Sequence, residues 1–537
     1  MSTKPVSSSL GLATEPAKRA RIACLPQRRS LSSAMFTPRL RALAPLLLAL
    51  SVSLAAQPAP APIVAADMMR HIQTLASDAY QGRAPGSEGE RLATSYIVRE
   101  LQARGLEPGG ENGTWFQPLR LVERVPGSSR VSWTAAGAPV EIAAGDIGLL
   151  GKEASETVTN APLIFAGYGV HAPERHVDQL AGADFHGAVA VILGNSPQVQ
   201  GFPPLRERVR GLFDAGAVAV LVVAPDAFPW DMFQRNFSRG TTRPDDEPVA
   251  ELTGILRGSA AQRLFAAAGG NFARLLTDEP GPAFHAVALP IRTTMQVETG
   301  VQRFATNNVI GRLRGTGTAH ENVMLLAHWD HFGTCRPPGV ADRICNGAVD
   351  NASGVAMMIE VAGHVAQGPR PSRDLLVMAT TAEEEGEIGA EYFATHPTVP
   401  LPSIVAAVNM DTVAIAPAGQ PVAILNRSVP SLNAAIAATA AAMGRRMDTA
   451  HEADQMADRQ DGATLARHGV PAVMVGGSFA SMARLNAFLN GRYHQPSDQA
   501  DGQIEMGGAV EDANLLVALV RRLGDPALYA NPARIVP

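Results

Sequence analysis

Cysteine, aromatic residues and charge are all scarce in this chain of 537 residues. It has three cysteines, and aromatic residues make up 5% and charged residues 18%, against 46% hydrophobic residues. This apolar content excludes a disordered chain, and the length suggests about two to four domains. The formal net charge of −5 does not indicate a nucleic-acid surface, so no nucleic-acid partner is expected.

Long hydrophobic runs are also absent, apart from one near the amino end. Residues 1–34 are polar and basic, and an apolar run then extends over residues 43–54. This arrangement is typical of a secretory signal peptide, and the run is too short to span a bilayer comfortably. We therefore expect residues 1–57 to be a leader and signal peptide that begins at Met1 or Met35. The mature protein would be secreted or periplasmic, with no membrane span; an unusually long leader and a retained anchor are the alternatives.

The cysteines divide between the leader and the mature chain. Cys24 lies in the leader, which leaves Cys335 and Cys345 as one pair close in sequence. In an oxidising compartment such a pair predicts one disulfide, with two free thiols as the alternative.

The mature chain divides into segments of different pattern. Residues 58–143 begin with two expected helices, the second opened by a capping box at Ser87 and Glu90. Residues 144–290 carry short β-branched runs around one helix, which predicts an inserted smaller β-rich or α+β domain. In residues 291–537 strands and helices alternate. That alternation predicts an α/β fold, with a mixed, mostly parallel sheet and helices on both of its faces.

Ionisable side chains follow the expected strands of this last segment. Ligands bind outside the carboxyl ends of the strands in such sheets, so these side chains should meet at one rim. The residues are His328 and Asp330 after one strand, Glu383 and Glu384 after another, Asp411 after a third, Asp350 in a loop that opens a helix, and Tyr493 and His494 in a late loop.

These residue types suit zinc, which prefers imidazole and carboxylate ligands. Two zinc ions a few ångström apart need one ligand that touches both, and a carboxylate can do so. A further carboxylate must stay off the metals to take a proton from water. Each pattern alone is weak, because an HxD triplet is often chance and consecutive glutamates often start a helix. Their order at successive strand ends indicates a catalytic site.

The motifs resemble those of the secreted di-zinc aminopeptidases of metallopeptidase family twenty-eight, which also contains glutamate carboxypeptidase-like enzymes and glutaminyl cyclases. They stand here as HWD, VDNASG, AEE, NMD and YHQPSD, and the likeness covers about residues 306–524. It implies a main di-zinc peptidase domain over 291–537, with 58–143 as its amino-terminal part. Residues 144–290 resemble the protease-associated insert of some members.

The resemblance implies an enzyme that uses two Zn²⁺ per chain to hydrolyse amino-terminal residues from peptides with a free N-terminus. A water between the metals would attack the peptide bond. The implied metal ligands are His328 and Asp411 for one zinc, Glu384 and His494 for the other, and Asp350 as the bridge. The implied roles around them are Glu383 as general base, Tyr493 at the oxyanion, Asp330 orienting His328, and Asp461 at a further acidic position.

Two departures from the family pattern bear on substrate preference. Glu387 stands where an apolar residue is usual, and Gln460 stands where serine often precedes the aspartate. The alternatives are a carboxypeptidase or dipeptidase, a glutaminyl cyclase, and a binding ectodomain without activity. A carboxypeptidase needs a basic cluster, for which Arg336, Arg343 and Arg492 flank the motifs.

Overall fold

The structure is a computed structural model that describes residues 60–195, 202–224, 229–247, 252–269, 272–276, 280–281 and 283–532. The expected leader and signal peptide, with Met35 and Cys24, lie outside the described residues. No helix in these ranges combines the length and the apolar character that crossing a membrane requires.

Six strands form the half of the large sheet that holds the ligand motifs. Its four central strands are all parallel, and the strand at each edge pairs antiparallel with its neighbour. The predicted mixed, mostly parallel sheet is therefore confirmed. The strands, in order across the sheet, are β12 (Val287–Leu313), β16 (Asp374–Thr380), β13 (Asn322–His328), β17 (Ile404–Asn409), β19 (Ala472–Gly476) and β18 (Ala423–Leu425).

Helices cover both faces of this half because its strands are apolar on both sides. In β13 the side chains of Val323 and Leu325 belong to the core on one face, and those of Met324 and Leu326 belong to the core on the other. The helices of the first core are α1 (Ala65–Leu75), α2 (Glu88–Ala103), α6 (Ser353–Gln367), α8 (Pro430–Ala442) and α11 (Met506–Leu523). Those of the second are α7 (Ile388–Thr395) and α9 (Asp461–Arg467).

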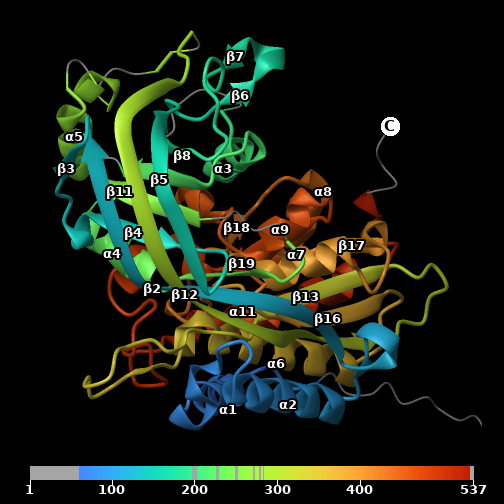
Figure 1. The fold of residues 1–537 in the computed structure, drawn as a ribbon. Coiled ribbons are helices and arrows are strands. Elements are labelled where there is room, and N and C mark those ends of the chain that lie inside the picture. Colours follow the sequence, from blue (N-terminus) through green and yellow to red (C-terminus); the bar gives the residue numbers. More distant parts are fainter. Residues whose placement is uncertain are drawn as a thin grey trace, which may run out of the picture. The chain divides into compact units, whose positions relative to one another are not determined.

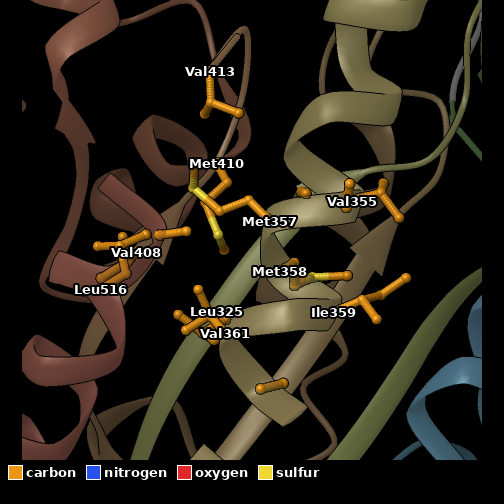
Figure 2. Packing of buried hydrophobic residues seen from close by; sticks show 14 of the residues in the cluster. Leu325, Val355, Met357, Met358, Ile359, Val361, Val408, Met410, Val413 and Leu516 are labelled. Carbon is orange, nitrogen blue, oxygen red and sulfur yellow. The ribbon is translucent and has the colours of Figure 1, made fainter. Parts of the chain in front are cut away.

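Helix α6 is the most deeply buried helix of the first core. Its Met357 and Val361 are fully buried in one cluster with Leu325 of β13, Val408 of β17 and Leu516 of α11 (Figure 2). This close packing matters for the site, because α6 begins directly after the loop that carries Asp350.

A second half of the sheet lies within the segment expected to be an insert. Its strands carry alternate side chains into two further cores. Its elements are β5 (Ser155–Phe165), β8 (Val189–Leu193), β9 (Ala219–Ala224), β11 (Leu252–Arg257) and β4 (Ile147–Leu150), with helices α3 (Leu205–Asp214), α4 (Trp230–Ser238) and α5 (Gly258–Ala267). One of the cores also includes Trp133 and Val297, which lie on either side of the predicted bounds 144–290.

Two long strands join the two halves. β2 (Phe116–Ala135) pairs antiparallel with the 27-residue strand β12, and both run from one half of the sheet into the other (Figure 1). A short strand, β10 (Thr241–Pro244), lies against the other edge of β2. The two halves therefore share continuous backbone hydrogen bonding, in addition to the chain that links them.

Candidate metal centre

Three of the motif loops begin where neighbouring parallel strands end. His328 is the last residue of β13, Glu383 follows β16 and Asp411 follows β17. β13 pairs in parallel with both of the other strands, so the three carboxyl ends lie at the same edge of the sheet. This is the rim that the sequence predicts.

Asp350 reaches the same rim from the loop before α6. Its Oδ1 lies 3.2 Å from His328 Nε2, and that nitrogen lies 3.6 Å from Asp411 Oδ1. The three side chains offer ligand atoms that all lie within 4.8 Å of one another. The structure therefore brings together the three residues that the sequence assigns to one metal and its bridge.

The second oxygen of Asp350 faces a different pair. Asp350 Oδ2 lies 3.4 Å from His494 Nε2, which in turn lies 2.9 Å from Glu384 Oε2. Glu384 also contacts Nδ1 of His331 through its other carboxylate oxygen, Oε1. His331 received no role from the sequence, although it stands three residues after His328 in the same HWDH segment and that short spacing was the available signal.

Several inward-facing atoms of this cluster are buried without a hydrogen-bond partner among the described residues. They are His328 Nε2, His331 Nε2, Asp350 Oδ2 and His494 Nε2. Buried polar atoms are nearly always paired, so such a group of nitrogen and oxygen atoms needs an explanation. Metal coordination supplies one, because imidazole nitrogen and carboxylate oxygen are the donors that zinc prefers. The residues present thus fit a metal centre.

The loop around Asp350 is held by residues that the sequence motif contains but whose roles the sequence did not assign. Asp498, the last residue of YHQPSD, accepts hydrogen bonds from the backbone N–H groups of Val349 and Asp350 at 3.0 Å. Asn351 donates its Nδ2 to the carbonyl of Met410 at 2.9 Å, directly before Asp411. A Cβ at Gly354 would collide with that same carbonyl, which accounts for a glycine there.

Arg83 also holds these loops in place, and the sequence reasoning did not identify it. Its guanidinium is buried and donates to the carbonyls of Trp329 at 2.8 Å, Asn346 at 2.6 Å and Gly347 at 3.0 Å. These carbonyls lie beside His328 and shortly before Asp350. One side chain therefore ties two ligand loops together, and no spacing in the sequence marks it.

Glu383 lies beside the cluster, with Oε2 at 3.9 Å from His328 Nε2. Burial raises the pKa of Glu383 well above its usual range. The charge of His328 opposes this effect, while the negative charges of Asp461, Asp411 and Glu384 add to it. A carboxyl group in this position is of the type that accepts and delivers protons in general acid–base catalysis.

Asp330 contacts the glutamate loop as well as His328. Its carboxylate lies 3.8 Å from His328 Nδ1, and that nitrogen donates to the backbone carbonyl of Asp330 at 3.2 Å. The Asp330 carboxylate instead accepts the backbone N–H groups of Glu383 at 3.2 Å and Glu384 at 3.4 Å. Those N–H groups follow the end of β16 and have no strand partner, so the Asp330 carboxylate serves as their acceptor. It therefore orients the glutamates more directly than it orients His328.

Tyr493 and Asp461 complete the surroundings. The Tyr493 ring stacks on His494 with a centroid distance of 3.5 Å, and burial together with the charges of Asp350 and Glu384 raises its pKa, which keeps the phenol protonated. Asp461 is fully buried and accepts a hydrogen bond from Thr380. Burial raises the pKa of Asp461 to about 7.

A cleft of about 890 Å³ opens onto the cluster and includes His331, Glu384, Tyr493 and His494 in its wall. A smaller pocket, of about 50 Å³, adjoins Asp350, Glu383 and Asp411, and it shares Arg459 and Tyr493 with the wall of the cleft. Its apolar lining consists of Leu425, Met456, Met474, Phe479, Leu485 and Leu489.

The cysteine pair lies at the edge of the same cleft. Cys335 lines it, and a disulfide joins Cys335 to Cys345, as predicted. The bond closes a loop between His328 and Asp350.

The two residues that depart from the family pattern lie elsewhere. Glu387 accepts a hydrogen bond from Arg467 at 3.0 Å, and the side chain of Gln460 caps α9 by accepting from the backbone N–H of Gly462 at 2.7 Å.

Comparison with known proteins identifies the family. Residues 308–519 match the model of Peptidase family M28, and this range contains every motif residue of the cluster. This part of the chain belongs to peptidase family M28. Membership in this family indicates a hydrolase that acts on peptides.

The chain also resembles individual proteins over short stretches. It is 33% identical over 93 residues to a vacuolar membrane protease of Schizosaccharomyces japonicus, and a second such protease, from Candida tropicalis, is 28% identical over 97 residues. These stretches are 17% and 18% of this chain, and each spans 10% of the length of its curated relative.

One solved structure supports the fold over most of this chain. It is the aminopeptidase from Aneurinibacillus sp. strain AM-1, with a TM-score of 0.54 and 18% sequence identity. The match covers 86% of this chain and 93% of that one. The predicted α/β fold is thereby confirmed.

Replacement of Asp498 should weaken metal binding without removing any ligand. Asp498→Asn loses the negative charge and one acceptor that hold the Asp350 loop, and such supporting residues typically contribute about 10- to 100-fold in metal affinity. Competition with a zinc chelator would measure the change. The matched control is Asp501→Asn in the same loop, whose carboxylate contacts Arg492 at 3.2 Å instead. Equal zinc affinity in the two variants would contradict the role given to Asp498.

Proposed function

We propose that the protein is a secreted zinc aminopeptidase that removes single residues from the free amino end of peptides. The observation that carries the proposal is the convergence of two ligand pairs on the two oxygens of Asp350. His328 lies 3.2 Å from Oδ1, and His494 lies 3.4 Å from Oδ2. A carboxylate with an imidazole at each oxygen has the geometry expected of a bridge between two metals.

In this proposal His328 and Asp411 hold one zinc ion, Glu384 and His494 hold the other, and Asp350 touches both. Two zinc ions, when bound, would polarise the peptide carbonyl and lower the pKa of water. His331 would act as a positioning residue, because its Nδ1 contacts Glu384 Oε1 and leaves Oε2 toward His494. A hydrogen bond to a ligand carboxylate is a common means of fixing its orientation.

The remaining work falls to Glu383 and Tyr493. Glu383 would take the proton of the attacking water and deliver it to the nitrogen of the leaving amine, for which its raised pKa is suited. Tyr493 keeps its proton, so its hydroxyl can donate to the oxygen that becomes negative as the carbonyl is attacked.

The apolar pocket beside the cluster supports removal of one residue at a time. It adjoins Asp350, Glu383 and Asp411, and its far side is formed by leucine, methionine and phenylalanine side chains. Its six apolar side chains would contact the side chain of one apolar residue, and burial of that side chain would favour binding. We therefore expect a preference for apolar amino-terminal residues.

Secretion remains part of the proposal. The disulfide between Cys335 and Cys345 is of the kind that persists in oxidising compartments, which agrees with the signal-peptide pattern of the leader.

A carboxypeptidase is the second candidate, and the arginines of the cleft favour it. Arg336 and Arg459 line the cleft and could receive a substrate carboxylate. Arg343 and Arg492 do not serve this purpose, since they donate to the carbonyls of Arg336 at 3.1 Å and Ser497 at 2.7 Å.

A panel of peptides separates these activities. The proposal predicts cleavage of Leu-peptides with a free amino group and none of their N-acetylated forms, with activity lost in a chelator and restored by zinc. Cleavage of N-acetylated peptides from the carboxyl end would establish the carboxypeptidase instead. Release of ammonia from N-terminal glutamine without cleavage would establish a cyclase, and no turnover by zinc-loaded protein would leave a binding ectodomain.

Substitution of the two adjacent glutamates tests their different roles. Glu383→Gln should lower kcat by about 10²- to 10⁴-fold, because the proton acceptor is lost while every metal ligand remains. Glu384→Gln should lose zinc as well as activity. Elemental analysis together with kinetics on a Leu-peptide measures both effects.

Glu387→Gln is the matched control, since the same change is made in the same loop outside the cleft. It should keep both zinc and kcat. The assignment is wrong if Glu383→Gln keeps full activity, and the two roles are exchanged if Glu383→Gln loses zinc while Glu384→Gln retains it.

A further inference from the structure

A second cavity, of about 540 Å³, lies in the other half of the sheet. It is formed between helix α3 and the strands β2, β4, β10 and β11. Its volume falls in the range of small-molecule sites, and none of its lining residues belongs to the M28 segment.

The wall of this cavity is rich in arginine. Arg124, Arg206, Arg210 and Arg243 line it, against two acidic residues, Asp214 and Glu247. One of the arginines is paired, because Arg206 Nη1 lies 2.9 Å from Glu247 Oε1. The wall therefore carries two more arginines than acidic residues, which favours an anion, although the nearby carboxylates of Glu153, Asp245 and Glu156 also act on Arg124.

Arg124 is the strongest indication of a ligand. Its side chain is buried, with 4% of the residue surface exposed, and its Nε donates to the carbonyl of Lys152 at 3.0 Å. Its Nη1 is also buried, and the described part of the chain provides no hydrogen-bond partner for it. A buried charged donor without a partner is costly, and a bound anion would satisfy it.

Apolar side chains also line the cavity. They are Leu205, Val209 and Phe213 of α3, which also carries Arg206 and Arg210, and Leu150 of β4. A wall that combines guanidinium groups with aliphatic and aromatic side chains is complementary to an organic anion, which has a charged end and an apolar body.

This cavity is distinct from the catalytic cleft, although one wall separates the two. β2 and β10 pair so that Arg124 is opposite Thr241, and Glu123 is opposite Thr242. Successive side chains of a strand point to opposite faces. Accordingly Arg124 and Thr241 line the arginine-rich cavity, while Glu123 and Thr242 line the cleft at the metal centre.

We propose that the arginine-rich cavity binds a small organic anion, a carboxylate or a phosphate monoester that carries an apolar group. The guanidinium of Arg124 binds the charged end, Arg210 and Arg243 contribute from the rim, and the apolar residues of α3 contact the rest of the ligand. The site does not depend on the peptidase activity, so its test uses binding alone.

The test titrates zinc-loaded protein with phenyl phosphate and, separately, with benzoate by isothermal calorimetry. The tighter of the two identifies the charged group. Arg124→Met and Arg243→Met should each weaken binding of that probe at least about tenfold, because each removes a charged hydrogen-bond donor. Arg130→Met is the matched control, since Arg130 is an exposed arginine on the same strand, and it should bind as the unaltered protein does.

Because Arg124 is buried, loss of binding in Arg124→Met supports the proposal only if the midpoint of thermal unfolding is unchanged. Arg243 and Arg210 lie nearer the surface, and Arg243→Met and Arg210→Ala therefore decide the matter if Arg124→Met fails to fold. Failure of the unaltered protein to bind either probe at millimolar concentration would overturn the proposal. So would equal affinity in Arg243→Met and Arg130→Met, because the probe would then bind elsewhere, for example at the zinc ions.

Discussion

The two oxygens of Asp350 face different imidazoles, and the rest of the metal centre is arranged around that division. Oδ1 faces His328 and Asp411 at the ends of β13 and β17, while Oδ2 faces His494 and Glu384. A carboxylate in this position is costly to bury unless its surroundings compensate the charge. Asp498 fixes the backbone of the loop, and Arg83 donates to Gly347, shortly before Asp350, and to Trp329, next to His328. The metal ligands thus rest on a layer of buried hydrogen bonds as much as on the sheet.

Much of this could be predicted from the sequence because the ligands stand at strand ends. A buried strand such as β13 or β16 is a recognisable apolar run, and the residue after it must reach the rim of a parallel sheet. The same logic placed Asp411. The same reasoning could not predict the contact of His331 with Glu384, because the sequence does not indicate the side-chain orientation of a histidine near a predicted ligand. It could not find Arg83, whose partners are backbone carbonyls that leave no pattern in the sequence.

The role of Asp330 as the residue that orients His328 stays a prediction. An aspartate two residues after a histidine is expected to contact the imidazole, but the free N–H groups of Glu383 and Glu384 lie closer to its carboxylate. The disulfide was predictable because the mature chain holds a single pair. The two long strands β2 and β12 could not be predicted. Each continues past the point where it changes its pairing partner, and that depends on contacts between segments far apart in sequence. β12 pairs with β16 at one end and with β5 at the other.

The joined sheet gives the inserted half a direct part in the cleft. Glu123 of β2 and Thr242 of β10 line the wall opposite the metal ligands, and the reverse of that two-stranded wall carries Arg124 and Thr241. Of these residues, Thr241 and Thr242 lie within the predicted insert of residues 144–290, whereas Glu123 and Arg124 precede it. The strands β2 and β10 form part of the wall of the cleft through Glu123 and Thr242.

Anomalous X-ray diffraction from zinc-loaded crystals, collected on both sides of the zinc absorption edge, tests the central claim most directly. The account predicts two anomalous peaks per chain, a few ångström apart, one beside His328 and Asp411 and one beside Glu384 and His494, with Asp350 between them. A single peak, or two peaks that do not share Asp350, would contradict it.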